Sequence, residues 1–348
     1  MTPDLFFTRL IDPGYEGAFA VFRLPDETNS YLSESERPLQ SGYAGKEGFL
    51  FAPFNPTERP AVFIPGKPVK LSPEFLNPMR PLTCPAIPGE DVPDTLKADF
   101  VNSVNQFKKI QENRPELKKI VLSAVKSKAA AGFDPVKTFR DLSEAYPRSF
   151  ILFFFSRVTG CWIGASPEPL IRKKGDRITL AAMAGTQPVQ GLRAWNPKEV
   201  SEFDYVDRFI TELIERHGLE DTKARKTETF RFGPVAHLFK NYICKVRPDF
   251  SLSGFVEDLH PTPAVCGTPR PQARELIGQL EKHRRGYYTG HFGLISDELT
   301  LLHVNLRSVK WNDEKLYFFA GAGIIRESDP EKEWEEIFQK MHSVEMVL

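Results

Sequence analysis

Residues 149–158 of the chain have the sequence SFILFFFSRV, in which every side chain from Phe150 to Phe155 is apolar. A strand with one face in water alternates polar and apolar residues, whereas a continuous apolar run is typical of a strand that is buried on both faces. We therefore expect residues 149–158 to form a strand inside a sheet that is covered on both sides.

Further strands are predicted on either side of this run. One is expected at Lys119–Ser123. Residues 161–184 are expected to form a hairpin that turns at Lys174-Gly175-Asp176. Residues 292–319 are expected to form a β-meander that turns at Asn312-Asp313.

Apolar periodicity and capping residues predict five helices. The first begins at Asp94, because Leu96, Phe100, Val104 and Phe107 recur at helical spacing. The others are expected from Asp134-Pro135 to near Pro147, over 197–217, over 271–284, and from Ser328-Asp329-Pro330 to about Met346. The sequence thus predicts an α+β protein with long antiparallel strands and helices outside them.

Prolines are concentrated between Pro53 and Pro93. Proline fixes φ and lacks an N–H donor, so this density excludes long helices and central strands. We interpret the stretch as a boundary between a short amino-terminal region, 1–93, packed on the core, and a catalytic core, 94–348.

The chain has 46 basic and 46 acidic residues, for a net charge of zero. This balance argues against nucleic acid or an anionic membrane as a partner. No apolar run approaches the roughly 20 residues of a membrane-spanning helix, and the first residues, which include Asp4, do not resemble a signal peptide. We therefore expect a cytoplasmic enzyme.

The cysteines are far apart in the sequence and lack zinc-ligand spacing. They are expected to be buried thiols in a reducing compartment, with neither a disulfide nor zinc. The four are Cys84, Cys161, Cys244 and Cys266.

Four segments have compositions that core packing does not require. They are residues 164–168 with the following Ala184-Gly185-Thr186, residues 260–269, residues 285–290 (RGYYTG), and Ala320-Gly-Ala-Gly323 before the last helix. Glu333, Glu336 and Lys340 share one face of that helix, and Glu202 lies on an earlier one. These carboxylates fit either a solvated helix face or, if they face one cavity, a magnesium site.

In this order the segments resemble the chorismate-utilising enzymes, the family of isochorismate, salicylate, anthranilate and aminodeoxychorismate synthases. The resemblance covers about residues 94–346. It rests on KIVLS at 119–123, GASPE at 164–168, AGT at 184–186, LHPTPAVCGTPRPQA at 259–273, RGYYTGHFG at 285–293 and AGAGIIRESDPEKEWEEIFQK at 320–340. It implies a large antiparallel β-sandwich flanked by helices, with the active site between the sheets.

The resemblance also implies roles for individual residues. Glu202 and Glu336 match the family's Mg²⁺ ligands, and Glu333 matches a glutamate that supports the ion through water. Arg307 and the amides around Gly321 and Gly323 match the site for the pyruvyl carboxylate of chorismate. Gly185, Thr186 and His260 are expected to line the ring pocket, with Ala264, Tyr288 and Lys340 nearby.

Lys119 favours water as the nucleophile, because family members that use ammonia carry a residue there that cannot act as a base. Addition of water at C2 with loss of the C4 hydroxyl requires a base and an acid. Lys119, its pKa lowered by burial, is expected to be the base, and Glu168, kept protonated, the acid. The sequence therefore predicts a Mg²⁺-dependent isochorismate synthase, an isomerase that converts chorismate to isochorismate.

Several alternatives remain open from the sequence. A salicylate synthase would add pyruvate elimination, although Ala264 argues against strong lyase activity. A non-catalytic binding protein of the same fold is a third reading. Menaquinone synthesis is preferred to siderophore synthesis as the pathway. The chain is expected to act as a monomer or weak dimer without a glutaminase subunit. Departures from the family pattern at Ala124, Gln187, Pro188 and Phe203 concern pocket detail.

Overall fold

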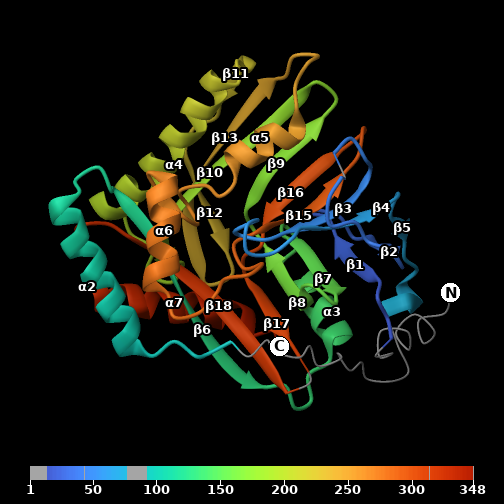
Figure 1. The fold of residues 1–348 in the computed structure, drawn as a ribbon, viewed down its shortest axis with the longest axis horizontal. Coiled ribbons are helices and arrows are strands. Elements are labelled where there is room, and N and C mark those ends of the chain that lie inside the picture. The colour runs from blue at the N-terminus through green and yellow to red at the C-terminus, as the bar shows by residue number, and fades with distance from the viewer. Residues whose placement is uncertain (1–13, 43, 77–91, 313, 348) are drawn as a thin grey trace.

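The computed structural model describes residues 14–42, 44–76, 92–312 and 314–347. Two nine-stranded sheets lie face to face (Figure 1). We call them sheet A and sheet B. Within each sheet, neighbouring strands pair in antiparallel orientation. In order across the sheet, sheet A contains β14 (Gly267–Thr268), β6 (Lys119–Ala129), β18 (Lys315–Ile324), β17 (Ser308–Trp311), β8 (Gly160–Ser166), β7 (Phe150–Ser156), β1 (Ala18–Arg23), β2 (Ser30–Ser35) and β5 (Val69–Lys70).

Sheet B contains the remaining strands. They are β11 (Glu220–Ala224), β13 (Val235–Lys245), β10 (Arg177–Pro188), β9 (Pro169–Lys174), β16 (Thr300–Val304), β15 (His291–Ile295), β3 (Gly48–Ala52) and β4 (Val62–Pro65), with β12 (Glu228–Phe232) paired to β13. The strands before residue 93 extend both sheets, since β1 pairs with β7 and β3 with β15. The division at residue 93 stays a prediction, because residues 77–91 lie outside the described part.

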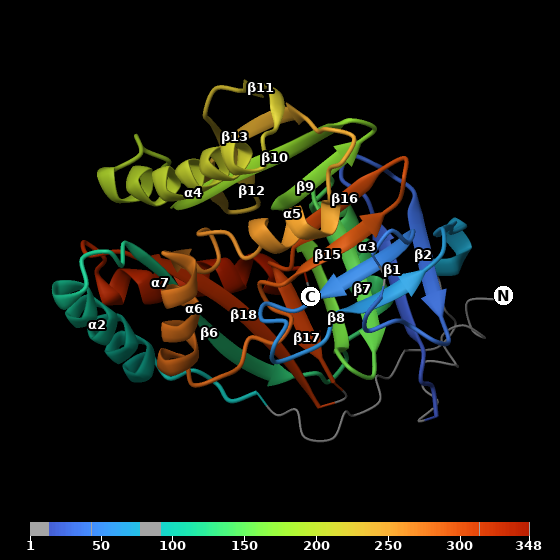
Figure 2. The ribbon, with the colours of Figure 1, turned by 45° about the horizontal axis from the view of Figure 1, so that its top comes forward.

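Helices cover the outer faces of both sheets (Figure 2). On sheet A, α7 (Pro330–Glu345) packs on β18, α6 (Arg270–Leu280) on β6 and α3 (Pro135–Ala145) on β7 and β8, while α2 (Lys97–Asn113) packs on α7. On sheet B, α4 (Pro197–Arg216) packs on β10 and β13, and α5 (Leu252–Leu259) lies against α4. A short 3₁₀ helix, η1, spans Pro73–Leu76. The predicted sandwich flanked by helices is confirmed.

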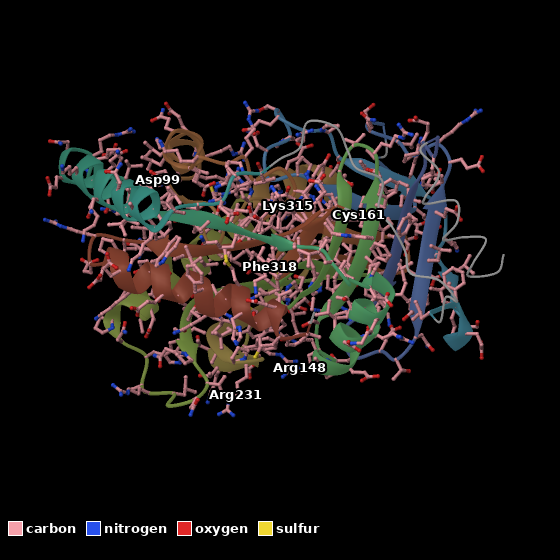
Figure 3. The ribbon with its side chains drawn as sticks, turned by 90° about the horizontal axis from the view of Figure 1, so that it is seen from below. Asp99, Arg148, Cys161, Arg231, Lys315 and Phe318 are labelled. Atoms are coloured by element: carbon pink, nitrogen blue, oxygen red, sulfur yellow. The ribbon has the colours of Figure 1, made fainter. Side chains whose placement is uncertain are left out.

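Apolar side chains fill the space between the sheets and the space under the helices, whereas charged groups gather at the rim (Figure 3). Aromatic rings dominate the inner core, where Phe51 and Phe154 from opposite sheets stack at 4.3 Å between ring centroids. Strand β7 is buried along its whole length, which confirms a doubly covered strand for Phe150–Ser156, whereas Arg157 and Val158 of the predicted 149–158 lie in the turn that follows. The many phenylalanines therefore serve this wide interior.

Two chain crossovers between the sheets meet beside the inner core. Pro167-Glu168 connects β8 of sheet A to β9 of sheet B, and residues 305–307 connect β16 of sheet B to β17 of sheet A. The crossovers are hydrogen-bonded to each other, because Val304 N donates to Glu168 O at 3.0 Å and Ala165 N to Arg307 O at 3.1 Å. These bonds fix Glu168 and Arg307 relative to each other.

The crossovers correct two predictions. The segment 161–184 is not one hairpin, because β8 belongs to sheet A and only β9 and β10 form the hairpin around Gly175. Residues 292–319 are likewise divided between the sheets, so Arg307 does not lie on a strand. Its φ of +52° is a conformation that side chains rarely adopt. Asp313 of the predicted turn lies outside the described residues.

The structure also tests the predicted helix starts, the predicted end of one helix and the expectation that no helix crosses a membrane. Asp134, Asn196 and Asp329 cap α3, α4 and α7 at their predicted starts. The helix predicted over 271–284 ends four residues earlier, at Leu280. Among the described residues no helix is long and apolar enough to cross a membrane.

The cysteines are not all free thiols. Cys244 and Cys266 are buried and free, as expected. Cys161 takes part in a disulfide, so the expectation is wrong for that residue. Cys84 lies outside the described residues.

Candidate active site

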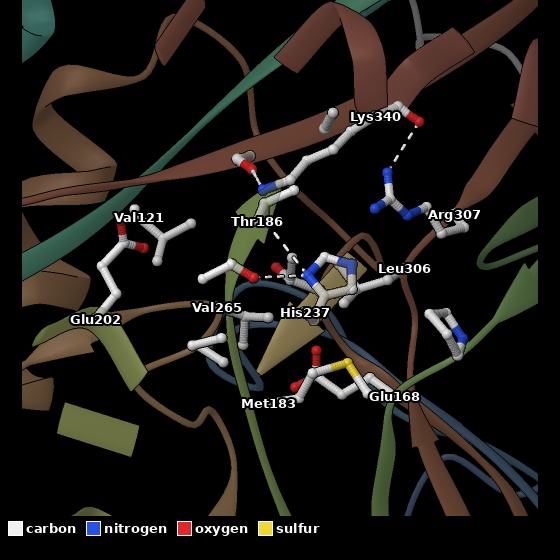
Figure 4. A pocket seen from close by; sticks show the side chains of 18 of the residues that line it. Val121, Glu168, Met183, Thr186, Glu202, His237, Val265, Leu306, Arg307 and Lys340 are labelled. Carbon is white, nitrogen blue, oxygen red and sulfur yellow. Dashed lines mark hydrogen bonds between the residues drawn. The ribbon is translucent and has the colours of Figure 1, made fainter. Parts of the chain in front are cut away.

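A cavity with an empty volume of about 710 Å³, its mouth included, lies between the sheets (Figure 4). The crossovers border it, together with strands β6, β10, β13 and β18 and helix α4. Most of the predicted site residues line it: Lys119, Glu168, Gly185, Thr186, Glu202, Ala264, Tyr288, Arg307, Gly321, Gly323 and Lys340. These residues come from nine separate segments of the chain and converge on one space.

Three predicted residues do not line the cavity. His260 lies behind it, where its Nε2 is 2.8 Å from the carbonyl oxygen of Thr289, which is itself a lining residue. Burial lowers the pKa of His260 to about 4, so the ring is a neutral donor to that carbonyl. Glu333 and Glu336 on α7 lie outside the lining. Glu336 contacts the lining residue Lys340, and Glu333 contacts Lys198, which in turn contacts the lining residue Glu202.

Lys119 is 1% exposed and faces the cavity from the inner side of β6. Burial lowers its pKa, and Lys340 and Lys198 act in the same direction, whereas Glu202 and Glu168 oppose the change. The Glu202 carboxylate is 3.6 Å from Lys119 Nζ. A buried amine of this kind loses its proton more readily than a surface lysine and can serve as a base.

Glu168 occupies the crossover between β8 and β9 and is buried. Burial raises the pKa of its carboxyl to about 7, although Lys119, Lys340 and Arg307 favour the charged form. Glu168 is therefore protonated much more readily near neutral pH than an exposed glutamate. A carboxyl of this kind can donate a proton to a leaving group.

Five charged side chains at the edge of the cavity form what we call the carboxylate–lysine cluster: Lys198, Glu202, Glu333, Glu336 and Lys340. Lys198 Nζ lies 3.1 Å from Glu202 Oε1 and 2.7 Å from Glu333 Oε1. Lys340 Nζ lies 2.6 Å from Glu336 Oε1. Two helices, α4 and α7, thus share one ammonium group.

The pKa values of the cluster reflect the proximity of its carboxylates. Burial, with added repulsion from Glu336, raises the pKa of Glu333 to about 7. Burial also opposes ionisation of Glu336, but Lys340 and Lys198 outweigh it, so its pKa is lowered. Burial disfavours the charged form of Lys198, yet attraction to Glu202 and the two α7 glutamates dominates and raises its pKa.

The carboxylates of the cluster suit a magnesium ion. Mg²⁺ uses one or two protein carboxylates and completes its shell with water and substrate oxygens. Glu202 and Glu336 offer such oxygens, and the buried Glu333 Oε2 has no hydrogen-bond partner. Within the described residues no three His, Cys, Asp or Glu side chains form a ready metal centre. Lys198 and Lys340 contact the carboxylate oxygens that an ion would use.

Gly323 makes room for this arrangement. A Cβ atom added there would lie 2.2 Å from Glu202 Oε2 and 2.9 Å from Lys119 Cε. Any side chain at this position of β18 would therefore displace Glu202. The carboxylate that lies against Gly323 in the structure is that of Glu202; binding of the pyruvyl carboxylate of chorismate at the amides around Gly321 and Gly323 stays a prediction.

Arg307 and Lys340 give another part of the wall a positive charge. Burial lowers the pKa of Arg307 to about 10, so the guanidinium remains charged at neutral pH. Its Nη1 donates to the carbonyl oxygen of Lys340 at 2.9 Å, and its guanidinium lies 5.5 Å from the Phe232 ring centroid. A small anion such as a carboxylate is the ligand that this wall favours.

Sequence reasoning missed two residues of the site. His237 on β13 lines the cavity, and its Nδ1 lies 2.9 Å from Gly185 O. Since a carbonyl only accepts, Nδ1 carries the proton, and burial lowers the pKa of the ring to about 3. A lone histidine in an apolar strand gives no distinct signal. Lys198 was signalled by its i,i+4 spacing to Glu202, a pattern that usually marks an exposed helix face.

The chain resembles known proteins along most of its length. Residues 88–348 match the family model described as chorismate binding enzyme. The chain is 30% identical over 237 residues to anthranilate synthase component 1 1 of Haloarcula marismortui, which covers 61% of this chain and 46% of that one. It is 29% identical over 189 residues to isochorismate synthase MenF of Haemophilus influenzae, which covers 51% and 44%. The matches thus span less than half of these two relatives.

Solved structures share the fold. The menaquinone-specific isochorismate synthase MenF of Escherichia coli superposes with a TM-score of 0.77 and 20% identity over 98% of this chain and 91% of that one. Anthranilate synthase component I of Streptococcus pneumoniae gives 0.69 and 18% over 94% and 89%. Together with the family match, these likenesses identify the chain as a member of the chorismate-binding enzyme family.

Proposed function

We propose that the protein is an isochorismate synthase that adds water at C2 of chorismate with loss of the C4 hydroxyl. The observation that carries the proposal is the pair of buried groups in one cavity. Lys119 has a lowered pKa, and Glu168 has a pKa raised to about 7. The two shifts favour a neutral amine and a protonated carboxyl, which the addition and the departure require.

The residues of this chain have distinct tasks in the reaction. Lys119 takes a proton from the attacking water, and Glu168 gives a proton to the oxygen that leaves C4. Each transfer contributes roughly 10²–10⁴-fold to the rate. Arg307 and Lys340 hold the pyruvyl carboxylate by charge. The step conserves protons, since Lys119 gains one and Glu168 loses one, and return of a proton from Lys119 to Glu168 restores both groups for the next turnover.

Glu202 and Glu336, with Glu333 beside them, are the residues that would hold Mg²⁺. When bound, the ion supplies charge that orients the ring carboxylate and balances the carboxylates around it. Menaquinone synthesis is the pathway that we propose. The MenF relatives are the support for that choice, and the chain is also 30% identical over 197 residues to the vibriobactin-specific isochorismate synthase of Vibrio cholerae.

Incubation of the protein with chorismate and Mg²⁺, followed by chromatography of the products, tests the proposal. Isochorismate without pyruvate is the expected result. Pyruvate together with salicylate would identify a salicylate synthase instead. Anthranilate formed with added ammonia would contradict the assignment of Lys119, and unchanged chorismate in the presence of Mg²⁺ would refute the proposed activity.

A further inference from the structure

A second cluster of buried charge lies behind the cavity. Arg285, from the RGYYTG segment, is 4% exposed and uses all five of its N–H donors. Nε and Nη2 donate to the Glu281 carboxylate, with 3.0 Å from Nε to Oε2 and 2.6 Å from Nη2 to Oε1. The other three donate to Val265 O at 2.7 Å, to Thr289 Oγ1 at 3.3 Å and to Val121 O at 2.6 Å. We call Arg285 and Glu281 the arginine clamp.

The clamp joins three segments that are distant in the sequence. Val121 lies on β6 two residues after Lys119, Val265 follows α5, and Thr289 follows Tyr288. All three partners of Arg285 line the cavity. The single guanidinium thus ties the strand of Lys119 to two neighbouring loops that also line the cavity.

Glu281 attaches the clamp to β6 at a second point. Its Oε1 accepts hydrogen bonds from Ser123 N at 2.7 Å and from Ser123 Oγ at 2.9 Å. Lys119, Val121 and Ser123 occupy alternate positions and share one face of β6. Two successive residues on the Lys119 face are therefore bound to the same ion pair.

Thr289 has a strained backbone that its hydrogen-bond partners hold in place. Its φ of +58° is unfavourable for a β-branched residue. Arg285 holds its hydroxyl, and His260 Nε2 lies 2.8 Å from its carbonyl oxygen. This accounts for His260, which lies outside the cavity lining yet is fixed against it.

The clamp is saturated, so it is not a ligand site. An apolar pair of similar volume often stabilises a fold as well as a buried ion pair does. A planar guanidinium fork, however, sets the distances among its acceptors in a way that lysine cannot reproduce. We therefore expect the Arg285–Glu281 pair to fix the distances among its hydrogen-bond acceptors more than to stabilise the fold.

We propose that Arg285 and Glu281 are positioning residues that set the placement of Lys119 relative to the loops holding the substrate ring. The inference rests on the proposed function. Loss of the fork frees the Thr289 loop from β6, although Val121 N still joins β6 to Cys266 O at 2.8 Å, so kcat falls while the carboxylates on α4 and α7 keep their geometry. Misplacement of a reacting group by about 1 Å costs roughly 10²-fold in rate.

Arg285→Lys is the test, and Arg23→Lys is its matched control. Arg23 is also buried and donates to five backbone carbonyls, none of which lines the cavity: Leu24, Glu27, Tyr146, Pro147 and Ser149. Both variants keep the charge and lose the fork. Unfolding curves, kcat, KM for chorismate and the Kd of Mg²⁺ are measured for both.

We expect Arg285→Lys to lower kcat by roughly ten- to a hundredfold, with a smaller change in KM and an unchanged Kd for Mg²⁺. Arg23→Lys is expected to lose stability and keep its kcat. Equal kcat values in the two variants would overturn the proposal. If Arg285→Lys does not fold, Ser123→Ala replaces it, and a kcat equal to wild type there has the same meaning. An inactive wild type would refute the proposed function alone.

Discussion

The carboxylate–lysine cluster and the arginine clamp are both buried and charged, yet they differ in how completely their groups are paired. In the clamp every N–H of Arg285 has an acceptor. In the carboxylate–lysine cluster, Lys198 is divided between Glu202 and Glu333, and Glu333 Oε2 has no partner. A saturated network fixes geometry, whereas an incompletely paired one retains capacity for a ligand.

Removal of the two proposed reacting groups, Lys119 and Glu168, has the largest expected effect on kcat. Lys119→Ala and Glu168→Gln should each lower kcat by roughly 10²–10⁴-fold, because each removes one proton transfer and neither belongs to the clamp. Chorismate turnover and unfolding curves provide the measurement. Lys118→Ala, at the exposed neighbouring position, is the control. Full activity in either variant would contradict the acid–base assignment.

Removal of the shared ammonium tests the incompletely paired cluster. Without metal, Lys198→Met should lower the free energy of unfolding by ~3–5 kcal/mol, because buried Glu333 loses its cation and Glu202 keeps only the more distant Lys119. Mg²⁺ should bind more tightly than to wild type and recover more stability, since Lys198 no longer competes. Denaturant unfolding and calorimetric titration with Mg²⁺ measure both effects.

Arg208→Met, at an exposed position of the same helix, is the control for Lys198→Met and should change neither quantity. Weaker Mg²⁺ binding to Lys198→Met would mean that the lysine supports the ion instead of competing with it.

The pH dependence of stability tests the environment of Glu168 without any activity measurement. Its pKa is raised from 4.5 to about 7 in the folded state, so folding favours the protonated carboxyl and wild type loses stability as pH rises from about 4.5 to 7. The loss amounts to ~3 kcal/mol. Glu168→Gln, which stays neutral, should gain on wild type across this window. Parallel stability curves for the two proteins would contradict the raised pKa.

Removal of an exposed ion pair should have the smallest effect on the free energy of unfolding, and it gives a reference value for the two buried clusters. Lys137 and Asp141 pair at i,i+4 on α3, with the lysine side chain 61% exposed. Lys137→Met should change the free energy of unfolding by only ~0.3–0.5 kcal/mol, because water screens the pair. Thermal unfolding at low and high salt measures it. A loss as large as that of Lys198→Met would show that burial is not what separates these charges.

Much of the fold could be predicted from the sequence, because the deciding signals are local. The apolar run at 150–155 marked a doubly covered strand, and Asp134 and Asp329 marked helix starts. The crossings of the chain between the sheets, at the β8–β9 and β16–β17 connections, could not be predicted. Two strands joined by a short connection have the same sequence pattern whether they pair in one sheet or lie in two. The signal for α6 continued past Leu280 because Lys282, Arg284 and Arg285 suit a helix end, although Arg285 serves the clamp.

The site was predicted unevenly for a similar reason. Lys119, Glu168 and Arg307 were singled out through ordered motifs, and the structure places them in one cavity. Their chemical roles stay predictions. His237 was not found, since its role depends on contact with Gly185, which is distant in the sequence. Lys198 was not found, since an i,i+4 pair with glutamate usually faces water, whereas here the pair is buried against Glu333.

The two helices that share Lys198 rest on different halves of the sandwich, α4 on sheet B and α7 on β18 of sheet A. A cation between Glu202 and Glu333 is therefore also a fastening between the halves. Loss of the Lys198 ammonium group would therefore break a link between the two halves of the sandwich as well as uncover two carboxylates.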